Sequence, residues 1–298
     1  MILLHLKPTD NIQEILNGYP LTEALEVHLE PGRYVQKLRI KHSHFKLFGS
    51  KSSPSIISYG DYSYKMHEDG LLYNTFRTET MMILGDHIEL HDLVIENMAG
   101  SSFTIGQAVA LTLYGDDIKL YSCKLLGHQD TLFLGPLPVD LTKRYDHFLP
   151  IEERHTKHVH HFFKDCYIEG DVDFIFGSST ALFDHCEIVA LNKGYITAPS
   201  TFEKFEYGMI FNRCLIISKS GQEDVLLGRP WREHGSSVFY QCTFQGLFDI
   251  KRFHDWDKKN YRFSEFPYHD SPFSKTIVEE EMEQLKIYVE KHFNCSIK

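Results

Sequence analysis

The sequence predicts an all-β protein folded as a parallel β-helix, and three observations support this. A short segment recurs with a cysteine at the same place, each copy alternates apolar and polar residues as a half-buried strand does, and helical periodicity is almost absent before residue 275. Short strands that recur without crossover helices favour a solenoid of stacked coils over a doubly wound sheet or a β-sandwich.

The repeat can be followed through six copies. Five copies carry cysteine at the common position and an earlier one carries leucine; these residues are Leu93, Cys123, Cys166, Cys186, Cys214 and Cys242. The intervals of 30, 43, 20, 28 and 28 residues indicate a basic coil with loops of different length inserted. The five cysteines are expected as buried free thiols stacked inside the coil, with disulfide pairing along the axis as the alternative.

Both ends of the chain have the features of short terminal helices. Residues 9–17 place apolar residues at helical spacing behind Thr9 or Asp10 as the N-cap candidate. Residues 275–293 carry a second apolar stripe, with glutamates in the first turn. We expect this second helix to cover an open end or a flank of the solenoid. One domain is expected over 1–298, with solenoid and loops over about 10–270.

Composition limits the possible partners and locations. The chain has 298 residues, 42% of them hydrophobic, and a formal charge of −10, which argues against nucleic acid or an anionic membrane as the partner. No apolar run approaches the roughly 20 residues of a membrane span. The opening segment 1–8 is too short for a signal peptide, so we expect a cytoplasmic protein, although an exported protein that had lost its signal peptide would look the same. We also expect a monomer.

Two aspartates share one register in the repeat. Asp130 follows Cys123 by seven residues, and Asp173 follows Cys166 by seven residues. Corresponding residues on adjacent coils of a β-helix lie about 4.8 Å apart, so the two carboxylates are expected to be neighbours. Adjacent carboxylates resist ionising together, which suits acid–base and nucleophilic chemistry. The structural alternative is that the aspartates only cap turns.

Four motifs occur in order along the chain. They are Gln107-Ala-Val-Ala-Leu111, Gly127-His-Gln-Asp-Thr-Leu132, Asp171-Val-Asp-Phe-Ile-Phe-Gly177 and Leu227-Gly-Arg-Pro-Trp231. The series resembles the pectin methylesterases (pectinesterases, carbohydrate esterase family 8) of bacterial type, which remove methyl groups from the homogalacturonan of pectin. The likeness runs from about residue 10 to 260, and it implies a right-handed parallel β-helix.

The resemblance also implies catalytic roles. By motif, Asp173 is the nucleophile, Asp130 the general acid and then base, and Arg229 the residue that holds Asp173. Gln107 and Gln129 are the oxyanion donors. These residue types suit ester cleavage, which needs a nucleophile, a proton for the leaving methoxide and donors for the oxyanion. In the structural alternative, the glutamines are rungs of a polar ladder and Arg229 forms a surface ion pair.

Two aromatic residues and a histidine cluster complete the candidate sites. Phe176 and Trp231 resemble the substrate-contacting aromatics of the family, and the alternative for Trp231 is a place in the core. The histidines considered as zinc ligands are His155, His158, His160 and His161. No cysteine or carboxylate completes a zinc set there, so we expect a solvent-exposed insertion, no metal and no cofactor. The insertion 135–160 is expected to form a long loop beside the groove.

Some features depart from the family pattern, and two rival functions remain. Gln36 stands where the family usually has glutamate, which we interpret as a structural change. Residues 246–253 and the tail after Phe263 fit poorly. A pectin-depolymerising lyase or hydrolase of the same fold is one rival, but neither a calcium-binding carboxylate cluster nor a galacturonase pattern is evident. A non-catalytic glycan-binding β-helix is the other. The resemblance to the pectin methylesterases makes methylated homogalacturonan or its oligomers the expected substrate.

Overall fold

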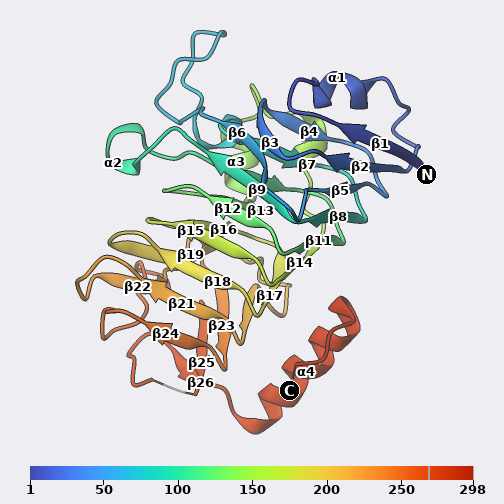
Figure 1. Ribbon diagram of the computed structural model, residues 1–298. Coiled ribbons are helices and arrows are strands. Elements are labelled where there is room, and N and C mark those ends of the chain that lie inside the picture. Colours follow the sequence, from blue (N-terminus) through green and yellow to red (C-terminus); the bar gives the residue numbers. More distant parts are fainter. Residues whose placement is uncertain (268, 298) are drawn as a thin grey trace.

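The computed structural model describes residues 1–267 and 269–297, and within them the strands form three parallel sheets of 11, 8 and 7 strands, which we call sheets A, B and C. Every pair of neighbouring strands within these sheets runs parallel; the first pair joins β1 to β2, and the last joins β25 to β26. The chain winds through the three sheets coil after coil, from the N-terminal end at the top of Figure 1 to the C-terminal end at the bottom. The predicted parallel β-helix is therefore the observed architecture.

The strands of each sheet follow one another in space in the order of the sequence. Sheet A contains β1 (Ile2–Leu6), β2 (Leu25–Leu29), β5 (Lys46–Phe48), β8 (Ile88–His91), β11 (Ile118–Tyr121), β14 (His160–Lys164), β17 (Thr180–Asp184), β20 (Met209–Asn212), β23 (Ser236–Tyr240), β25 (Arg262–Phe266) and β26 (Lys275–Thr276). Sheet B contains β3 (Gly32–Val35), β6 (Ser55–Tyr59), β9 (Leu93–Asn97), β12 (Lys124–Leu126), β15 (Tyr167–Gly170), β18 (Glu187–Ala190), β21 (Leu215–Ser218) and β24 (Thr243–Gln245). Sheet C contains β4 (Leu38–Ile40), β7 (Met81–Ile83), β10 (Leu111–Leu113), β13 (Leu132–Leu134), β16 (Ile175–Gly177), β19 (Gly194–Pro199) and β22 (Val225–Gly228).

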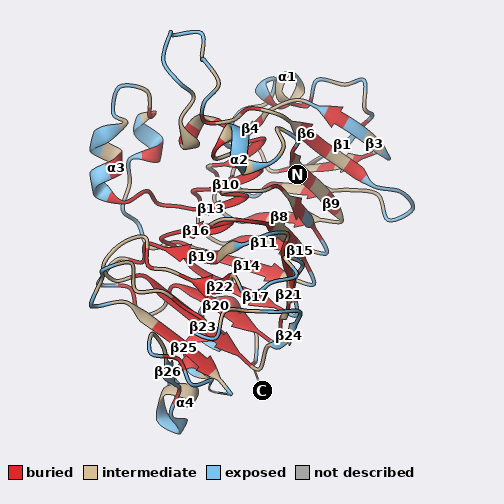
Figure 2. Cartoon of the chain, turned by 90° about the vertical axis from the view of Figure 1, so that its left-hand side faces the viewer, coloured by how far each residue is buried: buried red, intermediate tan, exposed pale blue. Residues whose placement is uncertain are grey.

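The helices are few and short. They are α1 (Ile12–Asn17), α2 (Ser102–Ile105), α3 (Val139–Arg144) and α4 (Glu279–Phe293), with 3-10 turns at η1 (Thr75–Arg77) and η2 (Ile151–Glu153). Figure 2 shows that most strand residues are buried, whereas α3 and α4 have exposed outer faces.

The interior of the solenoid is built from ladders of like residues. All six cysteines, each in the described part of the chain, are free, and Cys123, Cys166, Cys186 and Cys214 are buried. A phenylalanine ladder runs through Phe163, Phe183, Phe211 and Phe239, with ring centroids 4.5, 4.6 and 4.5 Å apart. Stacking of rings at this spacing adds to the free energy gained by burial.

The corner before each cysteine position has one backbone conformation. The residues there take φ between 51° and 55°; they are Asp92, Ser122, Asp165, His185, Arg213 and Gln241. Asparagine and aspartate tolerate this left-handed region better than most residues, and four of these six residues are neither. The coil geometry therefore imposes the conformation, since each corner packs between the corners of adjacent coils.

Helix α1 closes the N-terminal end of the solenoid. It buries Ile12 and Leu16 in the main core. The N-cap is Asn11, whose side chain accepts from the Glu14 N–H at 3.1 Å, so the prediction of Thr9 or Asp10 was wrong. Gln36 accepts from the Ile12 N–H at 2.8 Å, which gives this residue the structural role expected for it.

Helix α4 covers a flank of sheet A rather than the open end (Figure 1). It begins at Glu279, four residues later than the expected 275, because Lys275 and Thr276 form β26. Its buried side chains, including Leu285, Val289 and Phe293, pack on the outward residues of β14, β17, β20 and β23. The divergent stretch 246–253 continues the solenoid: Phe253 forms a parallel bridge to Gly228 at the end of β22 and is buried in the main core.

Candidate active site

The two aspartates lie side by side at one corner of sheet C. Because β13 pairs with β16 through Leu132 and Ile175, Asp130 and Asp173, each two residues earlier, occupy the same place on adjacent coils. Both have positive φ, +64° and +51°, a conformation that aspartate tolerates. Their backbone N–H groups donate to carbonyl groups of the next coil, at 3.1 Å for Asp130 and 2.7 Å for Asp173. The predicted proximity of the carboxylates is therefore present.

Arg229 binds Asp173 in a bidentate ion pair. Its Nε and Nη2 donate to Oδ1 and Oδ2 at 3.0 and 2.7 Å. The guanidinium is held between two aromatic rings, 4.1 Å from the centroid of Tyr195 and 3.9 Å from that of Trp256. The two parallel hydrogen bonds orient Asp173, and the flanking rings hold the guanidinium. The Arg229–Asp173 pair is therefore not the weak surface ion pair of the structural alternative.

The two carboxyl groups differ in their electrostatic environment. Asp130 is 8% exposed and Asp173 is 9% exposed. Burial, followed by the charge of Asp173, raises the pKa of Asp130 well above its usual range. Burial also raises the pKa of Asp173, but the hydrogen bonds and the charge of Arg229 oppose that rise. The arrangement therefore favours a protonated Asp130 beside an ionised Asp173.

Gln107 and Gln129 flank the aspartates, and both are partly exposed to the same cavity. The backbone of Gln107 is fixed by Ser63, whose N–H donates to the Gln107 carbonyl at 2.9 Å and whose hydroxyl accepts from its N–H at 3.1 Å. The Gln129 carbonyl accepts from the Ala108 N–H at 3.1 Å. Neither side-chain amide has a hydrogen-bond partner among residues 1–267 and 269–297, so both can donate to a group bound in the cavity.

The cavity holds about 460 Å³ and has an aromatic wall. Phe176 and Trp231 form part of this wall, with ring centroids 5.7 Å apart, and Phe76 lies 6.4 Å from Phe176. Phe176 itself is buried, whereas Trp231 is partly exposed. All seven predicted site residues therefore line one cavity; their roles stay predictions.

Part of the insertion 135–160 lines the cavity. The insertion contains the helix α3 and the 3-10 turn η2, whereas the sequence predicted a long loop. Arg232 binds Asp140 of α3 through Nε and Nη2 at 3.0 and 2.7 Å. Asp140, Leu141, Arg144 and Tyr145 all line the cavity. The insertion thus lies beside the site, as predicted.

The prediction that the histidine cluster is solvent-exposed was wrong. His161 is fully buried on β14, with its Nε2 2.9 Å from the Gly115 carbonyl and its Nδ1 3.0 Å from the Ser179 hydroxyl. His158 stacks on Phe205 at 3.9 Å. These rings pack against the solenoid instead of entering solvent. Within the described part of the chain, no group of three or more His, Cys, Asp or Glu side chains is arranged to hold a metal ion.

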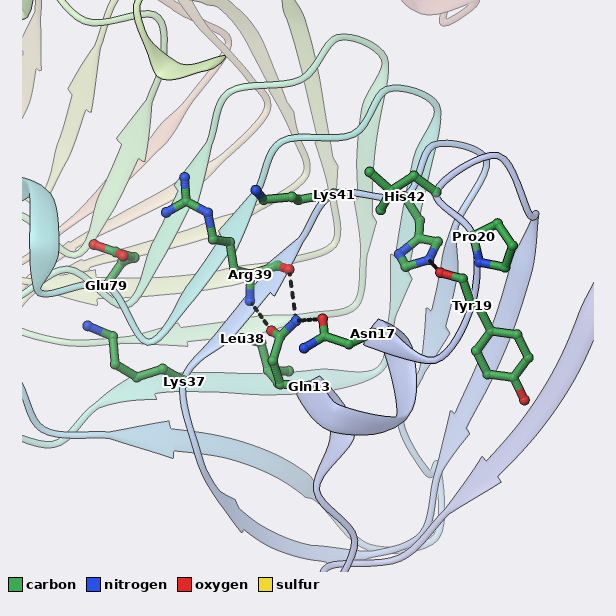
Figure 3. A pocket seen from close by; sticks show the side chains of 11 residues that line it. Gln13, Asn17, Tyr19, Pro20, Lys37, Leu38, Arg39, Lys41, His42 and Glu79 are labelled. Carbon is green, nitrogen blue, oxygen red and sulfur yellow. Dashed lines mark hydrogen bonds between the residues drawn. The ribbon is translucent and has the colours of Figure 1, made fainter. Parts of the chain in front are cut away.

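A larger cavity of about 780 Å³ lies at the N-terminal end, beside α1 and β4 (Figure 3). Gln13 of α1 bonds to the backbone of Arg39, accepting from its N–H at 2.7 Å. The basic residues there are paired: Lys37 binds Asp61 at 3.0 Å, and Lys41 binds Glu152 at 3.0 Å. Because the aspartate pair lies elsewhere and these charges are already neutralised, the smaller cavity is the better candidate for chemistry.

A family model described as Pectinesterase matches residues 9–136 and 153–271. The chain belongs to the pectinesterase family. Pectinesterase 31 of Arabidopsis thaliana is 30% identical over 255 residues, which cover 83% of this chain and 73% of that protein. The family match is interrupted over residues 137–152, which contain α3.

Solved structures of pectin methylesterases have the same right-handed parallel β-helix fold. The enzyme from Yersinia enterocolitica aligns with a TM-score of 0.75 at 24% identity, covering 91% of this chain and 95% of the other. A pectin methylesterase variant in complex with a hexasaccharide aligns with a TM-score of 0.76 at 20% identity, covering 100% and 98%. Within the residues described for this chain, no helix is both long and apolar enough to cross a membrane.

Sequence reasoning missed several residues in the cavity and one beside it, Tyr195. Trp256 stacks on Arg229, and it was missed because it follows closely after residues 246–253, which fit the family pattern poorly. Tyr195 could have been found from the register, because its carbonyl accepts from Asp173 on the preceding coil. Arg144 and Tyr145 lie in the insertion, outside any motif, and gave no signal.

Proposed function

We propose that this chain hydrolyses the C6 methyl esters of homogalacturonan or its oligomers and releases methanol, with Asp173 as the nucleophile. Family membership makes the chain a carboxylic ester hydrolase of the pectinesterase type. The observation that carries the residue roles is the asymmetry of the aspartate pair. Asp173 is held by Arg229, while Asp130 has a strongly raised pKa and makes no comparable ion pair in the described structure.

The first half of the reaction forms an acyl-enzyme. A carboxylate oxygen of Asp173 attacks the ester carbonyl carbon, and the carbonyl oxygen becomes an oxyanion. The amides of Gln107 and Gln129 donate to that oxyanion, which neutral preorganised donors do well in a partly buried site. As the C–O bond to the methoxy group breaks, Asp130 gives its proton to the leaving oxygen. The products are methanol and an anhydride between Asp173 and the uronate.

The second half regenerates the enzyme. Asp130, now ionised, takes a proton from a water molecule, and the water oxygen attacks the uronate carbonyl of the anhydride. The glutamine amides stabilise the second oxyanion as they did the first. Asp173 leaves as a carboxylate that Arg229 stabilises, and Asp130 is again protonated. The polysaccharide backbone is not cut at any step.

The proposal is tested by comparing products on highly methylated homogalacturonan. Methanol should appear in proportion to newly titratable carboxyl groups, without new reducing ends and without the ultraviolet absorbance of unsaturated uronate. Reducing ends or unsaturated uronate without methanol would favour the depolymerase rival. Binding without any product would favour the glycan-binding rival.

Two further expectations stay predictions. The chain is expected to be a monomer, which light scattering of the purified protein measures. A cytoplasmic location is expected from the sequence, and fractionation of the source cells tests it.

A further inference from the structure

Helix α3 brings one basic side chain into the catalytic cavity from outside the family match. Arg144, the last residue of α3, lines the same cavity as both aspartates and both glutamines. Residues 137–152 are the interval over which the pectinesterase match is interrupted. The chemistry of the site therefore comes from the solenoid, whereas Arg144 comes from an insertion that the family match does not cover.

Helix α3 is fixed in position by several contacts. Besides the bidentate pair between Arg232 and Asp140, Leu141 is buried in an aromatic cluster with Phe76 and Phe133. The Tyr145 ring lies 5.6 Å from the Phe76 ring. Farther along the insertion, Glu153 binds Arg39 of β4. The backbone that carries the exposed Arg144 side chain is therefore fixed beside the cavity, which lowers the entropy lost when that side chain binds a ligand.

Arg144 forms no ion pair within the described structure, although its charge is one of several causes that lower the pKa of Asp140 on the preceding turn. Within the described structure, the charged residues lining the cavity are Asp130, Asp140, Arg144, Asp173, Arg229 and Arg232. Arg229 pairs with Asp173, and Arg232 pairs with Asp140. In residues 1–267 and 269–297, Arg144 has no ion-pair partner. With Asp130 protonated, the cavity carries one surplus positive charge in a chain whose formal charge is −10.

We propose that Arg144 binds the free carboxylate of a galacturonate residue neighbouring the ester under attack, and thereby favours partly de-esterified substrate. This inference rests on the proposed function. A guanidinium matches a carboxylate through two parallel hydrogen bonds, whereas a methyl ester offers it only a neutral carbonyl acceptor. Each turnover leaves a carboxylate on the chain, so the product of one reaction becomes a recognition element for the next ester.

The experiment compares two substrates made from one preparation. Highly methylated homogalacturonan is assayed beside the same material after partial saponification with alkali, and kcat/KM per remaining ester is measured from methanol release. The wild-type protein should prefer the saponified substrate. Arg144→Gln should lower the ratio of the two kcat/KM values roughly two- to fivefold, mainly through KM, because an exposed charge-assisted contact contributes about this much. Arg144→Lys should restore part of the preference.

Lys143→Gln is the matched control, because Lys143 is an exposed cation on the same helix and does not line the cavity. It should leave the ratio at the wild-type value, and about 0.5 M salt should lower the wild-type ratio toward that of Arg144→Gln. An unchanged ratio in Arg144→Gln, or an equal fall in Lys143→Gln, would overturn the role of Arg144. Absence of methanol from both substrates with wild-type protein would instead contradict the proposed function.

Discussion

The phenylalanine ladder in the core and the aspartate pair at the edge of sheet C use one device, the placing of like residues on adjacent coils. In the ladder, Phe183 lies between Phe163 and Phe211 at centroid distances of 4.5 and 4.6 Å. In the pair, Asp130 and Asp173 occupy equivalent places on two coils. The first arrangement stabilises the fold, whereas in the second burial, followed by the charge of Asp173, raises the pKa of Asp130.

The difference between the two regions lies in what stacking does to each side chain. Phenyl rings lose contact with water and gain contact with one another, so both changes favour folding. Carboxylates lose hydration and then repel, so one of them retains its proton unless a cation compensates. Arg229 compensates only Asp173 by direct hydrogen bonds, which makes two chemically identical residues different.

The largest effect is expected for Asp173→Asn. The amide retains the volume of the side chain but is no nucleophile, so methanol release should fall on the order of 10⁴-fold or more. The pKa of Asp130 should fall as well, because the neighbouring charge is lost. Methanol assays and the thermal unfolding midpoint should be measured together. Near-normal turnover in a folded variant would show that the pair is not the catalytic centre.

Phe183→Ala tests the apolar side of the comparison. Phe183 is 0% exposed, and its removal should lower the free energy of unfolding by about 3 to 5 kcal/mol, the usual cost of a large cavity in a core. Denaturant titration measures this loss. Phe103→Ala is the control, since that ring is 95% exposed and its loss should change stability by less than about 0.5 kcal/mol. Equal losses in the two variants would contradict the role of the ladder.

Gln107→Ala and Gln129→Ala examine the donors beside the pair. Each should reduce kcat on the order of 10²-fold to 10³-fold, because one preorganised oxyanion donor is removed while the nucleophile remains. Gln222→Ala, in an exposed turn, should retain wild-type kcat. A change confined to KM would assign the glutamines to substrate binding instead.

Glu153→Gln tests a buried carboxylate outside the pair. Burial raises the pKa of Glu153 to about 7, although Arg39 opposes the rise. The folded state therefore keeps a proton that the unfolded state loses near pH 4.5, so this residue lowers stability as pH rises from about 4.5 to about 7. Relative to Glu153→Gln, the wild type should lose about 2 kcal/mol of unfolding free energy between about pH 5 and pH 8. Parallel pH profiles for the two proteins would contradict this pKa.

The periodic features of the sequence predicted the fold and the aspartate pair. The cysteine position recurs along the chain, and two aspartates in one register must become neighbours once coils stack. His161 carried the same kind of signal, which was missed. It pairs in register with Ile118 and Ala181, both buried, so its place inside the solenoid follows from the repeat.

Other features depend on contacts between residues distant in the sequence. Asn11 is the N-cap of α1, and Gln36, 24 residues after Ile12, accepts a hydrogen bond from the first turn of that helix. Arg213 and Gln241 take positive φ because neighbouring coils impose it, and their residue types do not predict it. The position of Arg144 depends on how α3 packs on Phe76 and Arg232, which no local pattern encodes.

The chain leaves the solenoid after β13 and rejoins it at β14. Helix α3 and the 3-10 turn η2 both lie between these points. Strands β13 and β16, which begin two residues after Asp130 and Asp173, are held by their neighbours on both sides, at β10 and β19. An insertion anchored in this way can change in length and composition while the rungs beneath it stay in register. Grafting residues 137–152 onto a relative should therefore transfer the substrate preference proposed for Arg144 without redesign of the hydrolytic centre, which makes this segment a natural unit for engineering.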